Sequence, residues 1–368
     1  MKIGLDIRSF LSRETGVGVY FKNLLNGIAK IDKFNEYFLF SSSLKERFPE
    51  ENLPPFQNYK LKDLKIPVSL LNSLWFRFKF PPLGMFFGNR LDLVHSPNPI
   101  LIPGGKKKII TVHDLSFIDL PDYVMPEAVK YFSGTLKSSL EKADKIITVS
   151  EFTKERILEH FGSDFENKIS YIYHGCDLDE ITEKPVEFEL PRDFLLFTGT
   201  LEPRKNLTTL IKAFSLVRQK QNGVKLILAG KKGWMFNEIR RMISILKLED
   251  EILISEYLNR EQLKFLYKKA KLLVFPSHYE GFGLPLLEAA NSGLPVIASD
   301  LKVFKEIFSD FPVYFNKDDP EDLGEKILSL YDDSTLYKRK KTEALSISKK
   351  FSWEKAAEKT LEIYNELS

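Results

Sequence analysis

Short, wholly apolar runs alternate with longer amphipathic stretches along this chain, and the alternation starts again near its middle. Apolar strands separated by helices are typical of a parallel sheet that helices cover on both faces. Two such series predict two doubly wound α/β domains, each built on its own parallel sheet. The expected strands are Ile3–Ile7, Tyr37–Phe40, Leu91–His95, Ile109–Val112 and Lys145–Val149, then Phe194–Thr198, Lys225–Ala229, Ile252–Ser255, Leu272–Phe275 and Val296–Ala298.

The length and composition agree with two domains. Of the 368 residues, 43% are hydrophobic and 29% are charged, which is enough apolar material for two cores. An acidic segment with two prolines, residues 178–191, lies between the two series and predicts a linker. We therefore place the boundary after residue 180. The expected helices include Val19–Ile31, Pro126–Lys142, Leu207–Val217 and Trp353–Leu367, the last with Ser352 as its cap.

Charge and cysteine content exclude several classes of function. The formal net charge is only +3, which gives no reason to expect a nucleic-acid partner. Cys176 is the single cysteine, so neither an internal disulfide nor a cysteine-based zinc site is expected. The sequence has no signal-peptide pattern and no run of about twenty apolar residues. We expect a cytoplasmic protein.

Ligands of open parallel sheets bind at the carboxyl ends of the strands, so a site is expected in the cleft between the two domains. The phrase Gly199-Thr-Leu-Glu-Pro-Arg-Lys-Asn206 joins one expected strand to the start of a helix. Its adjacent cations, Arg204 and Lys205, suit the two negative charges of a diphosphate. The alternative is a solvated turn with ordinary surface charges.

The most specific signal is Glu280-Gly-Phe-Gly-Leu-Pro-Leu-Leu-Glu288, which also follows an apolar strand. The glycines expose backbone N–H groups where a helix begins, and these can bind phosphate. Glu280 in the loop can accept hydrogen bonds from sugar hydroxyls, and Glu288 on the helix can bind a ribose. The alternative is a glycine-rich loop with one glutamate on a helix surface.

Two weaker signals lie in the first half of the chain. Gly16 and Gly18 follow the first strand, at the start of a helix, and either approach an anion or form only a tight turn. His113 ends an apolar strand and is a candidate for contact with a sugar or for proton transfer. His95 and His174 also end strands, and we interpret these two as structural.

A metal site is not expected. Asp177-Leu-Asp179 has a D-x-D spacing that can bind divalent cations, but it leads into the acidic linker, and we interpret the spacing as a coincidence. Asp318-Asp319 precedes Pro320 and predicts a helix cap. The sequence contains no Walker or Gly-x-Ser-x-Gly pattern.

Together these phrases resemble the retaining glycosyltransferases of family four, which have the GT-B fold of two Rossmann-like domains. The resemblance covers nearly the whole chain and is most specific in the pair of glutamates separated by seven residues. It implies that residues 181–351 bind the donor and that residues 1–180 form the acceptor-side domain, joined by the C-terminal helix 352–368. The phrases that carry it are Gly16–Gly18, Thr111–Asp114, Ile147–Thr153, Tyr173–Gly175, Gly199–Asn206, Leu228–Gly230 and Glu280–Glu288.

The resemblance also implies roles for individual residues. Arg204 and Lys205 would bind the donor diphosphate, and Glu280 would hold hydroxyls of the transferred sugar, while Glu288 would bind the ribose. His113 would lie beside the reacting sugar. The remaining implied contacts are the amides of Phe282, Gly283 and Leu284 near sugar and phosphate, Gly16 and Gly18 near phosphate, and Tyr257 and Leu258 near the base. One departure is Thr200, where many relatives have an arginine.

The form of the phrases is most similar to bacterial mannosyltransferases of surface polysaccharide assembly, including O-antigen and lipopolysaccharide. This implies GDP-mannose as donor, no metal, and a saccharide or lipid-linked saccharide as acceptor. A UDP-sugar donor, a sugar-nucleotide epimerase on the same fold and a non-catalytic sugar-nucleotide binding protein are the alternatives. Residues 74–87 mix aromatic side chains with Arg77 and Lys79, and Lys106-Lys107-Lys108 adds positive charge. This pattern indicates either peripheral membrane contact or a buried helix beside a solvated loop.

Overall fold

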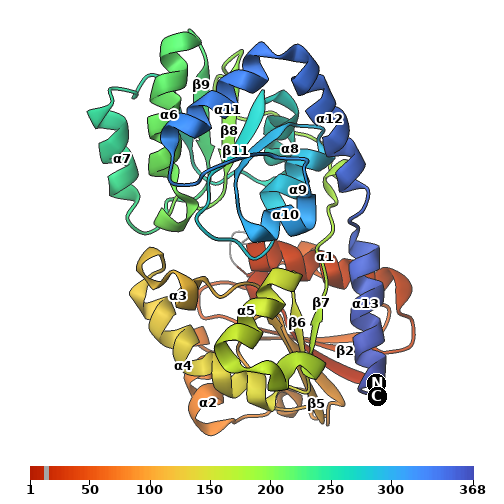
Figure 1. Cartoon of the computed structure of the whole chain (residues 1–368). Helices are drawn as coiled ribbons and strands as arrows, with labels where there is room; N and C mark the ends of the chain where they lie inside the picture. Colours follow the sequence, from red (N-terminus) through yellow and green to blue (C-terminus); the bar gives the residue numbers. More distant parts are fainter. Residues whose placement is uncertain (12–15) are drawn as a thin grey trace. The chain divides into compact units, whose positions relative to one another are not determined.

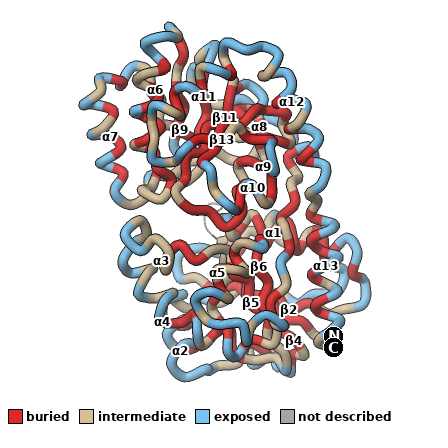
Figure 2. Tube along the Cα trace, in the orientation of Figure 1, coloured by how far each residue is buried: buried red, intermediate tan, exposed pale blue. Residues whose placement is uncertain are grey.

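The computed structural model describes residues 1–11 and 16–368. It divides into two compact units, each with a sheet inside and helices around it (Figure 1). The first unit comprises Met1–Asp119, Pro126–Gly175 and Ser352–Ser368, and the second comprises Leu120–Met125 and Cys176–Phe351. Buried residues are concentrated along the strands of both units (Figure 2).

In the described part of the first unit, seven parallel strands form a sheet of order β3-β2-β1-β4-β5-β6-β7. The strands are β1 (Lys2–Asp6), β2 (Glu36–Ser42), β3 (Tyr59–Leu64), β4 (Leu93–Ser96), β5 (Lys107–Val112), β6 (Lys145–Thr148) and β7 (Ile169–Tyr171). The helices are α1 (Gly16–Ile31), α2 (Val68–Phe78), α3 (Ser116–Asp119), α4 (Pro126–Lys142), α5 (Glu151–Phe161) and α13 (Trp353–Glu366).

The second unit contains a parallel sheet of order β10-β9-β8-β11-β12-β13. Its strands are β8 (Phe194–Thr198), β9 (Lys225–Ala229), β10 (Ile252–Ser255), β11 (Leu272–Phe275), β12 (Val296–Ser299) and β13 (Val313–Phe315). Its helices are α6 (Leu207–Lys220), α7 (Phe236–Ile245), α8 (Arg260–Lys269), α9 (Leu284–Asn291), α10 (Lys302–Phe308), α11 (Pro320–Asp332) and α12 (Ser334–Ser348). The expectation of two doubly wound α/β domains is confirmed.

Each strand listed from the sequence is present to within a few residues, and β7 corresponds to the strand expected before His174, but β3 and β13 were not expected. Both lie at the edge of a sheet. An edge strand pairs on one side only and is less completely covered, so it does not need the wholly apolar run that marks a central strand. Strand β3 shows this well, because Tyr59–Leu64 mixes lysine and aspartate with apolar residues and none of them is fully buried.

The chain passes from the first unit to the second after Gly175, five residues before the expected boundary. The short 3-10 helix η6 (Leu178–Glu180) is bound into the second unit. Asp177 accepts a hydrogen bond from Arg260, and the Asp179 carbonyl accepts one from Lys264 at 3.2 Å. These bonds hold the start of the segment that the sequence indicates as a linker.

The segment Leu120–Met125 also belongs to the second unit, although residues of the first unit flank it on both sides. The ring of Tyr123 packs edge-on against His278, with the ring centroids 4.7 Å apart. The sequence gives no sign of this excursion, because it depends on a contact between residues far apart in the chain.

The C-terminal helix α13 is part of the first unit and packs against α1 (Figure 1). Ser352 caps it by accepting a hydrogen bond from the Lys355 amide, as expected. Two glycines allow the close approach of the backbone at this end of the helix. A Cβ on Gly175 would lie 2.1 Å from the Trp353 nitrogen, and one on Gly27 would lie 2.8 Å from the Trp353 oxygen.

Among the described residues, no helix combines the length and the apolar character that a membrane crossing requires.

We predict that Gly175→Ala lowers the free energy of unfolding by about 2 kcal/mol or more, because its methyl group would overlap the backbone at the start of α13. Urea denaturation followed by circular dichroism measures the change. The matched control is Gly134→Ala in α4, where no atom beyond its chain neighbours and its own helix backbone lies within 4 Å of the added Cβ. This control should be neutral or stabilising by about 0.5–1 kcal/mol, since alanine favours a helix interior over glycine. Equal effects of the two substitutions would contradict the packing role of Gly175.

Candidate functional site

The strands β8 and β11 are neighbours in the second sheet, so the loops that follow them leave the same edge side by side. Backbone and side-chain bonds join these loops directly. The His278 amide donates to the Arg204 carbonyl at 2.9 Å, and the Arg204 guanidinium donates to the Tyr279 carbonyl at 3.0 Å. Two segments that lie more than seventy residues apart in sequence therefore form one surface.

The centre of this surface is an ion pair between Lys205 and Glu280, both only 8% exposed. Arg204 contacts the other oxygen of the Glu280 carboxylate at 3.4 Å and also pairs with Glu202 at 3.2 Å. A buried charge without a partner is strongly destabilising, so each member of this cluster depends on the others. The predicted association of Arg204, Lys205 and Glu280 in one place agrees with these contacts.

Burial and charge act in opposite directions on Glu280. Burial alone would raise the pKa of its carboxyl, but Lys205 and then Arg204 lower the pKa below its usual value. Glu280 is therefore ionised at neutral pH. The stability that the cluster contributes is present above the ordinary pKa of a glutamate and is lost as the pH falls through the lowered pKa. For Lys205, burial is the largest effect and lowers its pKa, although Glu280 opposes the shift.

The two cations, Arg204 and Lys205, are balanced by the two carboxylates, Glu202 and Glu280. The two positive and two negative charges sum to zero, so these four side chains together present no net positive charge to an anion. An arriving diphosphate would compete with the carboxylates for the cations. The arrangement can bind an anion most strongly when Glu280 is at the same time occupied by hydroxyl donors.

The N-terminus of α9 lies between the two glutamates of the motif and supplies backbone donors. Gly283 caps the helix with φ +105°, and a Cβ there would lie 2.8 Å from the Phe304 ring. Only glycine fits this position without strain. The first amides of a helix have no intrahelical acceptor, so the amides of Gly283 and Leu284 are suited to bind phosphate or sugar oxygens. Phe282 precedes the cap, and the role of its amide stays a prediction.

Glu288 lies within α9, as expected, and both of its carboxylate oxygens have partners. The Tyr267 hydroxyl donates to one oxygen at 2.9 Å, and Arg260 lies 3.6 Å from the other. The Tyr267 oxygen in turn lies 2.8 Å from the Thr198 hydroxyl at the end of β8. Because the tyrosine proton goes to the carboxylate, Thr198 is the donor in this contact. The chain Thr198–Tyr267–Glu288 fixes the orientation of the carboxylate.

Arg260 and Tyr267 were not expected as site residues, and neither forms a sequence motif. Both lie on α8, whose first residue is Arg260, and Asn259 caps this helix through a capping box with Gln262. A sequence signal was available only in part, because a capping box marks the start of the helix but not which of its side chains reach Glu288. Arg260 also binds Asp177, so it links η6 to Glu288.

Tyr257 and Leu258 follow β10 and are half-buried. The Lys231 ammonium lies 5.4 Å from the centre of the Tyr257 ring, a cation–π distance. Lys231 follows Gly230, where a Cβ would lie 1.8 Å from the Gly199 oxygen. This clash explains the glycine of the phrase Leu228–Gly230, since the ends of β8 and β9 touch there. The role of Tyr257 and Leu258 beside a base remains a prediction.

In the first unit, His113 directly follows β5, and its Nε2 lies 2.8 Å from the Pro97 carbonyl. Because a carbonyl can only accept, Nε2 carries the proton, and Nδ1 is the acceptor nitrogen. Burial lowers the pKa of His113, so the ring is neutral. This geometry suits acceptance of a hydrogen bond from a hydroxyl and does not suit the donation of a proton from a charged imidazolium.

A buried network surrounds His113. Tyr20 packs edge-on against the His113 ring, with centroids 4.9 Å apart, and its hydroxyl lies 3.4 Å from that of Thr111. Thr111 lies 2.9 Å from His95, whose other ring nitrogen lies 2.7 Å from the Tyr364 hydroxyl on α13. Burial lowers the pKa of His95 to about 3. The interpretation of His95 as structural agrees with these two side-chain bonds.

His174 is also buried, and it packs between aromatic rings of the first unit. The centroid of its ring lies 4.7 Å from that of Tyr20 and 5.6 Å from that of Trp353.

Gly16 is the first residue of α1, and Gly18 is buried in the first turn of this helix. Thr15, the residue before Gly16, lies outside the described residues. The expected approach of Gly16 and Gly18 to phosphate stays a prediction.

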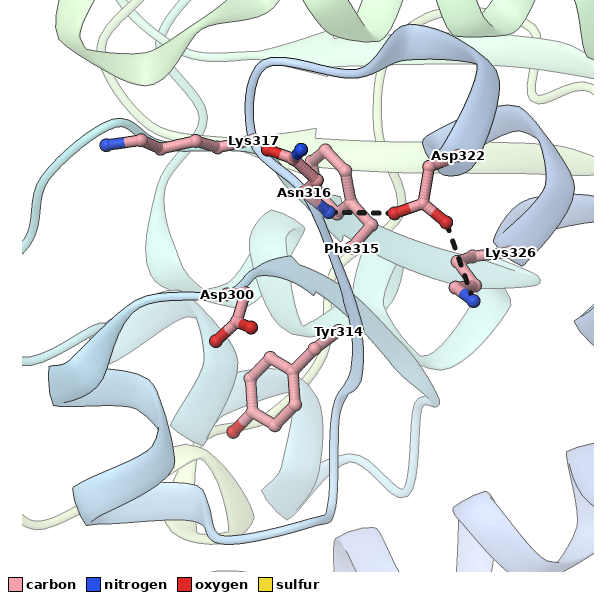
Figure 3. A pocket seen from close by; sticks show the side chains of 7 residues that line it. All are labelled: Asp300, Tyr314, Phe315, Asn316, Lys317, Asp322 and Lys326. Atoms are coloured by element: carbon pink, nitrogen blue, oxygen red, sulfur yellow. Dashed lines mark hydrogen bonds and ion pairs between the residues drawn. The ribbon is translucent and has the colours of Figure 1, made fainter.

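The polar hollow drawn in Figure 3 lies beside β12 and β13, has a volume of about 500 Å³, and contains none of the predicted donor residues. Its lining is Asp300, Tyr314, Phe315, Asn316, Lys317, Asp322 and Lys326. It adjoins the loop after β8, since Asn206 donates to the Lys317 carbonyl at 2.7 Å.

The aspartates considered in the sequence analysis have other partners. Asp319 caps α11, as expected, by accepting a hydrogen bond from the Asp322 amide. Asp179, of the D-x-D spacing, accepts a hydrogen bond from Asn291 at 2.9 Å.

Known proteins resemble both halves of the chain. The model described as Glycosyltransferase Family 4 matches residues 15–180, and the model described as Glycosyl transferases group 1 matches residues 179–346. The chain is 31% identical over 281 residues to the O-antigen chain mannosyltransferase B of Escherichia coli, with 74% of each chain covered. The chain belongs to the family-four glycosyltransferases. The resemblance expected from the motifs is confirmed, and the epimerase and binding-protein alternatives are set aside.

Solved structures agree on the architecture of this glycosyltransferase. Sucrose-phosphate synthase from Thermosynechococcus elongatus has a TM-score of 0.77 and 20% identity, with 100% of this chain and 98% of that chain covered. HepE from Anabaena, solved in complex with UDP and glucose, has a TM-score of 0.73 and 16% identity, with both chains fully covered. At such low identity the likeness concerns the fold alone, and the expected GT-B fold is confirmed.

We predict that Glu280→Gln strengthens the binding of a nucleoside diphosphate roughly fivefold or more, because it frees Lys205 and Arg204 from a competing carboxylate. The same change should reduce kcat by about 100-fold, because the acceptor for sugar hydroxyls is weakened. Isothermal titration calorimetry and steady-state kinetics measure the two effects.

The matched control is Glu202→Gln, which removes the same charge from Arg204 but leaves Glu280 in place. Its kcat should stay close to that of the unchanged protein. Thermal unfolding without nucleotide checks that both variants fold. An unchanged affinity for the diphosphate in Glu280→Gln would contradict the competition between carboxylate and phosphate.

We predict that Tyr267→Phe weakens donor binding by roughly fivefold, the effect of one hydrogen bond of about 1 kcal/mol, because Glu288 loses its orientation. The KM for donor should rise while kcat changes little, since the ribose does not take part in the bond change. Tyr337→Phe is the control, because its hydroxyl binds the Lys271 carbonyl at 3.1 Å, outside this network. Equal donor KM values for the two variants would refute the role of Tyr267.

Proposed function

We propose that this glycosyltransferase transfers mannose from GDP-mannose to a saccharide or lipid-linked saccharide, with retention of configuration, in the synthesis of a bacterial surface polysaccharide. The observation that carries the proposal is the buried Lys205–Glu280 pair with Arg204 beside it, since it combines cations for a diphosphate with an ionised acceptor for sugar hydroxyls. The choice of mannose rests on the relative from Escherichia coli, which is named for O-antigen mannosyl transfer.

The donor would extend along the ends of the strands in the second unit. Its diphosphate would bind Lys205, Arg204 and the first amides of α9, and its ribose hydroxyls would bind Glu288. The hexose would donate hydroxyl hydrogens to Glu280, which releases the cations for the phosphate. His113 would accept one further sugar hydroxyl at Nδ1. Tyr257 and Leu258 would lie against the base.

The transfer step needs stabilisation of the leaving diphosphate and of a positively charged sugar. As the bond between the anomeric carbon and the phosphate oxygen breaks, Lys205 and Arg204 neutralise the charge that develops on the leaving group. The acceptor hydroxyl attacks from the same face, and a phosphate oxygen takes its proton. Glu280 is a weak nucleophile and a weak base because two cations lower its pKa, which favours this front-side path over a covalent intermediate.

No divalent metal is part of the proposal. In metal-dependent transfer the cation neutralises the leaving diphosphate, and here Lys205, Arg204 and the α9 amides would supply that neutralisation. The carboxylates of Asp177 and Asp179 are bonded to Arg260 and Asn291, respectively. We propose that the reaction takes place in the cytoplasm, at the inner face of the plasma membrane, where a lipid-linked acceptor would be held.

A panel of sugar nucleotides tests the proposal. We expect GDP and GDP-mannose to raise the melting temperature more than UDP and UDP-glucose, and we expect Lys205→Ala to remove most of the shift. Transfer to a mannosyl acceptor should give an α-linked product by nuclear magnetic resonance and should continue in EDTA. A larger shift with UDP-sugars would favour the alternative donor, while a β-linked product or a magnesium requirement would overturn retention or the metal-free step.

A further inference from the structure

The polar hollow of Figure 3, which we call the β13 hollow, takes no part in the proposed donor site. Asp300 directly follows β12, and residues 316–317 directly follow β13, so the hollow lies at the carboxyl ends of two neighbouring strands. Ligands of open parallel sheets bind at these ends. Its volume of about 500 Å³ is within the range of about 300–1,000 Å³ that is usual for small-molecule sites. The lining consists of Asp300, residues 314–317, Asp322 and Lys326.

The charged side chains of the β13 hollow form two pairs, each of one acid and one amine. Lys305 of α10 lies 2.6 Å from Asp300, and Lys326 of α11 lies 3.5 Å from Asp322. All four side chains are more than a quarter exposed. The remaining charged group of the lining, Lys317, extends away from the other lining side chains in Figure 3. Each pair therefore offers a hydrogen-bond acceptor beside a donor, with no excess of either charge.

This pairing indicates the charge of a suitable ligand. An anion that approached either ammonium would also meet the carboxylate beside it, and a cation at the carboxylate would meet the ammonium. A neutral ligand with adjacent hydroxyl groups avoids both conflicts, because one hydroxyl can donate to the carboxylate while its neighbour accepts from the ammonium. Exposed ion pairs contribute little to the stability of a fold, so a ligand can share these groups without destabilising the protein.

An aromatic side chain provides an apolar part of the β13 hollow. The Tyr314 hydroxyl donates to the Ser309 carbonyl at 2.7 Å, which fixes the ring. Figure 3 shows the Asp300 carboxylate beside this ring, and the Lys305 ammonium lies 5.8 Å from the ring centre. A hexose has C–H groups on its faces and hydroxyls around its rim. It can therefore pack against the ring while its hydroxyls reach the carboxylate and the ammonium.

The part of the hollow around Asp322 is held by backbone bonds. The Asn316 amide donates to the Asp322 carboxylate at 2.8 Å, and the Asp322 amide donates to Asp319, the cap of α11, at 3.0 Å. The Asn206 side chain donates to the Lys317 carbonyl, which joins the hollow to the loop of the proposed diphosphate site. These groups are in place before a ligand arrives, which lowers the cost of binding.

We infer that the β13 hollow binds a neutral saccharide. Its two acid–amine pairs hold neighbouring hydroxyls of the saccharide, and the Tyr314 ring packs against the C–H groups. The hollow is separate from the predicted donor residues but lies at the same edge of the same sheet. Binding of a saccharide here does not depend on the nature of the donor. That this saccharide is part of the acceptor chain rests on the proposed function.

Isothermal titration calorimetry of the full chain with an α-linked mannotetraose tests the inference. We expect the double variant Asp300→Asn/Lys326→Gln to raise the Kd at least about tenfold, because it removes one charged partner from each pair. Tyr314→Leu should raise the Kd about fivefold, whereas Tyr314→Phe keeps the ring and should stay within about twofold. Tetragalacturonate, which carries carboxylates, should bind at least about fivefold more weakly than the mannotetraose.

The matched control is Glu183→Gln/Lys268→Gln, which removes an exposed acid–amine pair, 3.0 Å apart, elsewhere in the second unit. It should leave the Kd unchanged. The inference would be overturned by no binding of the mannotetraose, by an unchanged Kd in Asp300→Asn/Lys326→Gln, or by equal Kd values for the two Tyr314 variants. Tetragalacturonate that binds as tightly as the mannotetraose would overturn it as well.

Melting temperatures with and without GDP separate this result from that of the proposed function. They show that each variant is folded, and the shift with GDP reports on the donor site, to which none of the substituted residues belongs. A normal shift without saccharide binding would overturn only the role of the β13 hollow. Saccharide binding without any shift would count against the donor site alone.

Discussion

Parallel pairing of β8 with β11 is the constraint on which the candidate site depends, because it brings the loops around Lys205 and Glu280 to the same edge of the sheet. A buried lysine or a buried glutamate alone would be strongly destabilising in this place. Each becomes tolerable because the other is present, and Arg204 completes the set. The stability of the loops and the anion binding that we propose for them therefore depend on the same charged side chains.

This origin has a consequence for ligand binding. The cluster is electrically neutral without ligand, so a diphosphate alone gains less than the count of cations suggests. In the donor complex that we propose, hydroxyls on Glu280 and phosphate oxygens on Lys205 and Arg204 would satisfy these charges together. The proposed site would then distinguish a sugar nucleotide from a free nucleotide by the contact of the sugar with Glu280. Glu288, fixed by Tyr267 and Arg260, contributes at the other end of α9 through a separate set of contacts.

The first unit shows a different use of burial. His95 and His174 are enclosed among aromatic and hydroxyl groups and remain neutral, as does His113, whose Nε2 proton is held by a backbone carbonyl. The helix α13 takes part through Tyr364 and Trp353, although it is the last segment of the chain. Burial thus keeps these histidines of the first unit neutral.

The sequence by itself determined the two parallel sheets, because a central strand must be apolar on both faces and so leaves a visible run. It also indicated Arg204, Glu280 and Glu288 as candidate site residues, since glycine and charge at strand ends form local patterns. Only the tertiary structure decided the edge strands β3 and β13, the excursion of Leu120–Met125 and the contacts of Arg260 and Tyr267 with Glu288. The reason is the same in each case. Edge pairing, a contact such as Tyr123 with His278, and the reach of α8 to α9 depend on distances between segments remote in the chain, and no local period or motif encodes them.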